Sequence, residues 1–205
     1  MTDEKEVEEE KTKLIMFPDL FAESTVRTSG IYGEINEERS KATIASLYQL
    51  KSIISTNNEE EEKDPESPLP IDFIISTEGG NVQDMFAVYD CMRDIQKDCE
   101  LHTFGLGKVM SAGILLLAAG TKGKRRVGKY CRLMMHSIQG GQFGSIKELE
   151  TDIREVRWYQ EQFIKAIGDE SKLDKKELKK IFASQTDTYF DAKQAVEWGL
   201  ADEII

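Results

Sequence analysis

Strand-like and helix-like stretches alternate along most of the chain. Short apolar runs at residues 30–35, 71–76 and 101–106 have the length and composition of buried strands. Apolar residues recur at helical spacing between the first two runs, over residues 37–54, and between the next two, over residues 82–95. This alternation is typical of parallel β-α-β units, in which the carboxyl ends of the strands carry the functional loops. The pattern therefore predicts an α/β fold.

Helical periodicity also dominates the C-terminal third of the chain. Residues 145–167 alternate apolar and charged positions as in an amphipathic helix that covers a sheet. Asp174 and Glu177 have the spacing of a capping box at the start of a shorter helix. The stretch 192–200 predicts a final short helix that ends at Gly199, a residue suited to the turn after a helix.

Two acidic stretches interrupt this pattern. Residues 1–28 begin with a dense run of carboxylates, which predicts a solvated, flexible segment rather than a partner-binding arm. Residues 57–70 are acidic and contain prolines, as expected of an exposed loop whose added length costs little stability. With 205 residues, of which 40% are apolar, the chain is long enough for one sizeable core. We expect one folded domain over residues 29–205.

Net charge and hydropathy narrow the classes of partner. The formal net charge of −11 argues against a nucleic-acid surface, although a local basic cluster lies at residues 122–126. No stretch approaches the roughly 20 apolar residues of a membrane span, and the acidic start lacks the pattern of a signal peptide. We therefore expect a cytoplasmic protein without membrane contact.

The cysteines predict neither a metal site nor a disulfide framework. Cys91, Cys99 and Cys131 form no C-x-x-C pair and have no histidine set nearby at ligand spacing. Free buried thiols are the simplest interpretation, and no cofactor or metal is expected. A cysteine nucleophile is disfavoured because Cys91 falls within an amphipathic helix and Cys131 begins a strand without an evident base beside it.

The strongest chemical candidates are a serine and one of the two histidines of the chain. Ser111 lies just before the apolar run 112–119, and His136 closes the short strand 132–136 ahead of a pair of glycines. A serine hydroxyl needs a positioned imidazole to accept its proton before it can attack a carbonyl. Ser111 is therefore the candidate nucleophile and His136 the candidate base.

The remaining parts of such a site can also be assigned. Asp187, in an aromatic-rich segment near the C-terminus, is the candidate acid that orients the imidazole. The backbone amides of Gly80, which follows the strand 71–76, and of Ala112 are candidate donors to an oxyanion. No metal or cofactor enters this assignment.

Each of these residues also has a plain structural interpretation. A serine before a helix is most often an N-cap, and a histidine at a strand end is most often a packed, hydrogen-bonded residue. Ser111 lacks a G-x-S-x-G elbow because Val109 stands two residues before it. The order Ser, His, Asp also differs from that of the familiar serine hydrolase folds. The hypothesis of a catalytic site therefore depends on the combination of these residues and not on any one of them.

Four sequence blocks in a fixed order carry a family resemblance. From about residue 29 to residue 205 the chain resembles the proteolytic subunit of the Clp protease. The blocks are Ile75 to Gly80, Ser111 to Gly120, Leu133 to His136 with Gly140 and Gly141, and Asp187 to Asp202. The N-terminal segment diverges from the family.

The resemblance implies a serine peptidase of crotonase-like fold, with a projecting helix and strand, the handle, at residues 137–168. It further implies stacked seven-membered rings of identical subunits, an AAA+ unfoldase ATPase as partner, and unfolded proteins or peptides as substrates. Ser111, His136 and Asp187 match the catalytic triad, and Gly80 and Ala112 match the oxyanion amides. The chain departs from the family at Glu78, where a proline is usual, and at Ala112, where a methionine is usual.

Three functions of different class follow from these observations. The first is an ATPase-assisted serine endopeptidase, and it alone accounts for all three side chains. The second is a non-catalytic or dormant subunit of a mixed Clp ring. The third is a crotonase-fold enzyme acting on acyl thioesters, which would use the same oxyanion amides without needing the Ser, His and Asp set.

Overall fold

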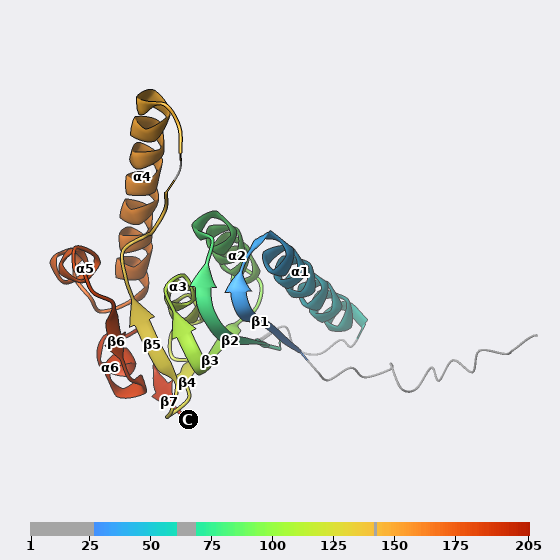
Figure 1. The fold of residues 1–205 in the computed structure, drawn as a ribbon. Coiled ribbons are helices and arrows are strands. Elements are labelled where there is room, and N and C mark those ends of the chain that lie inside the picture. The colour runs from blue at the N-terminus through green and yellow to red at the C-terminus, as the bar shows by residue number, and fades with distance from the viewer. Residues whose placement is uncertain (1–26, 61–68, 142) are drawn as a thin grey trace, which may run out of the picture.

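Seven strands and six helices alternate along the part of the chain that the computed structural model describes, namely residues 27–60, 69–141 and 143–205 (Figure 1). The predicted N-terminal segment and most of the predicted acidic loop lie outside these residues. The strands are β1 (Thr28–Ile35), β2 (Ile71–Gly80), β3 (Leu101–Met110), β4 (Arg125–Val127), β5 (Arg132–Met135), β6 (Thr188–Phe190) and β7 (Glu203–Ile204). The helices are α1 (Glu37–Glu60), α2 (Val82–Ile95), α3 (Gly113–Ala118), α4 (Ile146–Glu170), α5 (Lys175–Phe182) and α6 (Ala192–Glu197).

The strands form one sheet that branches at β3. The main path runs β1-β2-β3-β4-β7, and all of its pairs are parallel. The first half of β3 pairs with β4, whereas its second half, Lys108 to Met110, pairs with β5. Strand β6 then pairs antiparallel with β5. This branch brings the ends of β2, β3 and β5, and the start of β6, into one region.

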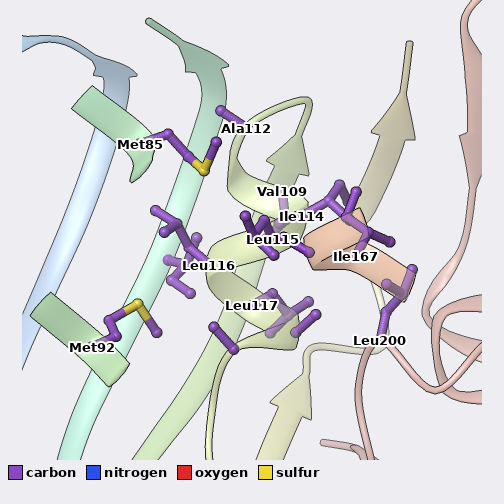
Figure 2. Close-up of a cluster of buried hydrophobic side chains, with 14 of the residues drawn as sticks. Met85, Met92, Val109, Ala112, Ile114, Leu115, Leu116, Leu117, Ile167 and Leu200 are labelled. Carbon is purple, nitrogen blue, oxygen red and sulfur yellow. The ribbon is translucent and has the colours of Figure 1, made fainter. Parts of the chain in front are cut away.

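Helix α3 forms the centre of the apolar core. Every residue from Gly113 to Ala118 is buried, and the helix contacts β2, β3, α2 and α4. Figure 2 shows Met85 and Met92 of α2 and Ile167 of α4 packed around Leu116 and its neighbours. A six-residue helix has little stability of its own, so its position depends on this burial.

Helix α4 extends beyond the rest of the molecule (Figure 1). Only the C-terminal part of α4, including Phe163 and Ile167, is buried. Toward its N-terminus Ile146, Ile153 and Trp158 are at least half exposed. This arrangement corresponds to the helix of the predicted handle, and its start is fixed by a capping box at Ser145.

Several predicted boundaries were wrong. Helix α1 continues to Glu60, into the stretch 57–70 that was predicted as a loop. The predicted strand of the handle does not form: Gly140, Gly141, Phe143 and Gly144 lie outside any strand. Glycine loses more backbone freedom on ordering than any other residue does. In the described chain no neighbouring strand pairs with this segment to offset that loss.

Two predictions about the C-terminal helices are confirmed. The capping box of Asp174 and Glu177 starts α5, and Gly199 has a positive φ of 70° just after α6. Within the described residues, none of the helices is both long enough and apolar enough to cross a bilayer. The same part of the chain holds no cluster of three or more potential metal-binding side chains.

Candidate active site

Ser111 occupies a sharp turn between β3 and α3. Its φ of 53° is the only positive φ among the described non-glycine residues. This left-handed conformation costs a residue with a side chain on the order of 1–2 kcal/mol. The backbone holds it there, because the Ser111 N–H donates to the Met134 carbonyl at 2.8 Å and its carbonyl accepts from Ile114 at 3.0 Å.

Ser111 is not an N-cap. Helix α3 begins at Gly113 with Ala112 in the cap position, and no side chain caps it. The plain interpretation of this serine is therefore wrong, and its hydroxyl is left for another partner.

That partner is the imidazole of His136, directly after β5. His136 Nε2 lies 2.8 Å from Ser111 Oγ, so the hydroxyl can donate to Nε2 when the imidazole carries its proton on Nδ1. The pairing of β5 with the end of β3 produces this contact. Two residues that are 25 positions apart in sequence thus meet because their strands are neighbours.

Asp187 is near the histidine but not bonded to it. Strand β6 pairs antiparallel with β5, with Thr188 opposite Met135, and this places Asp187 beside His136. Asp187 Oδ1 lies 3.9 Å from His136 Nδ1, which is beyond hydrogen-bonding distance. Nδ1 is buried and has no hydrogen-bond partner in the described structure. The Asp187 side chain is 42% exposed and has room to move.

Gly79 and Gly80 pass so close to their neighbours that no larger residue fits. A Cβ on Gly79 would lie 2.6 Å from the Cβ of Ser111, and one on Gly80 would lie 2.1 Å from the Ile35 carbonyl oxygen. Both have positive φ, at 96° and 151°. The glycine pair therefore brings a backbone segment against the Ser111 turn.

Thr77 holds this glycine segment in place and was not among the site residues predicted from sequence. Its hydroxyl accepts from the Gly79 N–H at 2.9 Å and donates to the Gly33 carbonyl at 2.5 Å. Thr77 is fully buried, and the strand registers shift here on both sides, between Tyr32 and Glu34 and between Ile75 and Thr77. The Thr77 hydroxyl thus bonds backbone groups at the point where the regular pairing between the strands is interrupted.

A cavity of about 430 Å³ joins these parts. It contains four of the five predicted site residues, Gly80, Ser111, Ala112 and His136, but not Asp187. Its other lining residues are Glu34, Glu78, Gly79, Asn81, Val82, Met85, Ile138, Gln139 and Phe163. A separate cavity of about 530 Å³ between α4 and α5 contains none of the predicted site residues.

Two carboxylates line this cavity. Glu78 forms an ion pair with Lys108 at 2.7 Å, and the hydrogen bond from Lys108 lowers the pKa of the Glu78 carboxyl below its ordinary value. Glu34, at the shifted register of β1, is exposed and was not among the predicted site residues. Its location next to Gly79 follows from strand pairing, so no local sequence pattern indicated it.

The arrangement is suited to attack on a carbonyl group. A hydroxyl lies within hydrogen-bonding distance of an imidazole, and the Gly80 and Ala112 backbones lie beside it in the same cavity. Imidazole assistance and nearby amide donors are the two requirements of nucleophilic acyl transfer. None of the three cysteines lines this cavity, and burial raises the pKa of the Cys91 and Cys131 thiols to about 11.

Comparisons with known proteins identify the family to which the chain is similar. A family model described as Clp protease matches residues 10–205. The ATP-dependent Clp protease proteolytic subunit of Borreliella afzelii (strain PKo) is 30% identical over 173 residues, which cover 84% of this chain and 80% of that protein. The ATP-dependent Clp protease proteolytic subunit 2 of Chlamydia pneumoniae is also 30% identical over 173 residues, covering 84% of this chain and 77% of that protein.

Proposed function

The chain belongs to the Clp protease family, with its crotonase-like α/β fold, and from this premise we propose that it is a serine endopeptidase that uses Ser111, His136 and Asp187 as a catalytic triad. The family is one of peptidases, so the reaction class is hydrolysis of peptide bonds. The single observation that supports the serine mechanism is the 2.8 Å contact between His136 Nε2 and Ser111 Oγ. We assign the peptidase domain to residues 29–205.

The first half of the proposed reaction acylates the serine. Ser111 Oγ attacks the peptide carbonyl as its proton passes to His136 Nε2, and the Gly80 and Ala112 amides donate to the developing oxyanion. The C–N bond then breaks, and His136 returns the proton to the leaving amine. In the second half, water attacks the acyl-enzyme with the same proton transfers in sequence and releases the carboxylate product.

Asp187 would act on the imidazolium that forms in each half-reaction. The positive charge on His136 attracts the Asp187 carboxylate, which at 42% exposure can rotate to close the 3.9 Å gap to Nδ1. Catalytic hydrogen bonds are often long in an unliganded site and tighten in the complex. The unpartnered Nδ1 is the group that this movement would satisfy.

The assembly is part of the same proposal. The names of both relatives describe the proteolytic subunit of an ATP-dependent Clp protease. From the family resemblance we propose a ring of identical subunits with a separate ATPase partner. The exposed apolar side chains along the projecting part of α4 are suited to contacts between subunits. Unfolded proteins or peptides would be the substrates, without a metal or cofactor in this subunit.

A dormant subunit is the second candidate, and the 3.9 Å gap at Asp187 is the observation that favours it. In that case the triad would close only after a partner subunit moves β6 or Asp187. An acyl-thioester enzyme has no such support, because it would leave the Ser111–His136 contact without a role.

A fluorophosphonate probe separates these candidates. The purified chain is labelled beside Ser111→Ala and His136→Ala variants, with the assembly mass measured on the same samples by size-exclusion chromatography. Labelling of the wild-type chain that is lost in both variants supports an activated Ser111. An assembled ring that remains unlabelled, and that cleaves no peptide, would contradict the endopeptidase and leave the dormant subunit.

A further inference from the structure

The cavity beside Ser111 has an apolar part and an acidic part. Val82, Met85, Ile138 and Phe163 supply the apolar surface. Glu34 and Glu78 supply two carboxylates to the same lining. A side chain that fills this space would meet hydrocarbon and negative charge together.

The described lining contains no lysine or arginine to balance these carboxylates. Glu78 is paired with Lys108, but Lys108 lies outside the lining. Among the described residues Glu34 forms no ion pair within 4.0 Å, although the Arg39 guanidinium lies beside the neighbouring Gly33 and its charge also acts on Glu78. Both side chains are glutamates on strands next to the glycine pair, and glutamate is ionised at neutral pH.

The proposed mechanism determines which substrate residue enters this space. The attacked carbonyl carbon must come within reach of Ser111 Oγ, with its oxygen at the Gly80 and Ala112 amides. The side chain of the residue that supplies this carbonyl starts one bond away. The space next to that carbonyl is the cavity that Gly80, Ser111 and Ala112 line, so we assign the side chain to it.

We propose that Glu34 and Glu78 select substrates with a lysine or arginine at the residue that supplies the attacked carbonyl. This inference rests on the proposed peptidase function and adds a substrate class to it. Lysine and arginine place an aliphatic stem on apolar surface while the charged end stays at a polar rim, which matches the two parts of this cavity. A purely apolar side chain would fit the apolar part of the cavity, but it would displace water from the carboxylates without replacing their hydrogen bonds.

The test compares two peptides that differ in charge alone. Matched fluorogenic peptides carry either arginine or citrulline, its neutral isostere, immediately before the scissile bond. We expect kcat/KM to be on the order of fivefold to tenfold higher for the arginine peptide, the size of an exposed pairing with one or two carboxylates. The preference should shrink as salt screens the charges. Equal values of kcat/KM would overturn the inference.

Three variants locate the preference. Glu34→Gln and Glu78→Gln should each lower the arginine-to-citrulline ratio, and Glu34→Lys should bring it to one or below. Glu37→Gln is the matched control, because Glu37 is a nearby exposed glutamate outside the cavity lining. A ratio that falls equally in Glu37→Gln would show a general effect of net charge and refute the assignment to this cavity.

Binding to the Ser111→Ala protein separates this inference from the proposed function. Fluorescence polarisation with labelled arginine and citrulline peptides measures selectivity without hydrolysis. Selective binding with no fluorophosphonate labelling of the wild-type chain would mean that the peptidase function is wrong while the cavity still selects cations. Normal labelling and hydrolysis without selectivity would refute only the inference.

Discussion

Replacing Thr77 by valine tests whether one buried hydroxyl holds the glycine segment, Gly79 and Gly80, in place. Valine has nearly the same shape, so the methyl group that lies against Gly113 is retained. The two hydrogen bonds of the hydroxyl, to the Gly79 N–H and the Gly33 carbonyl, are lost. Because Thr77 is fully buried, water cannot readily replace them.

The expected loss follows from these two contacts. Leaving a buried donor or acceptor without its partner costs about 1–3 kcal/mol, so Thr77→Val should lower the free energy of unfolding by roughly 2–4 kcal/mol. If the glycine segment then shifts, the Gly80 amide leaves its position, and misplacement of about 1 Å can lower kcat by about 100-fold. We expect a fall in kcat of roughly 10-fold to 100-fold with a smaller change in KM.

Urea unfolding and peptide hydrolysis measure the two effects separately, and Thr77→Ser is the matched control. Serine keeps the hydroxyl and loses only the methyl, so it should retain most of the activity at a cost of about 1 kcal/mol in stability. A Thr77→Val protein with wild-type kcat and an unfolding free energy within 1 kcal/mol of wild type would refute the reasoning. Equal loss of kcat in both variants would assign the effect to packing instead.

Three further predictions concern strain, charge and thiol reactivity. Ser111→Gly should be about 1–2 kcal/mol more stable in urea unfolding than Ser111→Ala, since glycine adopts a φ of 53° without strain; equal stability would show that the turn is unstrained. Asp202→Asn should lose about 2–4 kcal/mol at pH 7, because Asp202 is the carboxylate bonded to the buried Arg125 at 2.6 Å and 2.9 Å. Burial alone would raise the pKa of Asp202, but hydrogen bonds and the charge of Arg125 outweigh burial, so the pKa in the folded protein is lowered. The stabilisation by the Asp202–Arg125 pair is therefore present above the unfolded pKa of about 3.9 and is lost as the pH falls through the folded pKa. The difference in unfolding free energy between the wild-type protein and Asp202→Asn should therefore be smaller at pH 3 than at pH 7. An equal difference at the two pH values would contradict the ion pair. All three cysteines are buried, so a thiol reagent at pH 8 should label the native protein slowly and the unfolded protein at every cysteine; rapid native labelling, seen by mass spectrometry, would contradict the raised pKa values.

The order of strands and helices and the identity of the candidate reactive groups could be predicted from sequence. Apolar periodicity is a local property, so it located β1, β2, β3 and α2, although β2 and β3 each continue four residues past their predicted ends. A capping box located the start of α5. Ser111 and His136 could be identified as candidates because the chain has only two histidines, and because these two residues lie at the ends of predicted elements. Local patterns failed where no apolar repeat was present, as in the last turns of α1 and the glycine-rich segment near residue 140.

The distances that make these residues a site were decided by tertiary structure alone. Strand pairing joins segments far apart in sequence: β5 beside the end of β3 brings His136 to Ser111, and β6 beside β5 brings Asp187 to within 3.9 Å. Glu34 and Thr77 acquire their roles in the same way, through shifts in strand register around the glycine pair. A register shift depends on how whole strands pack against α3 and the core. The residues that neighbour it along the chain therefore do not predict it. The sequence alone therefore determined which chemical groups are present, and the packing of the sheet determined where they meet.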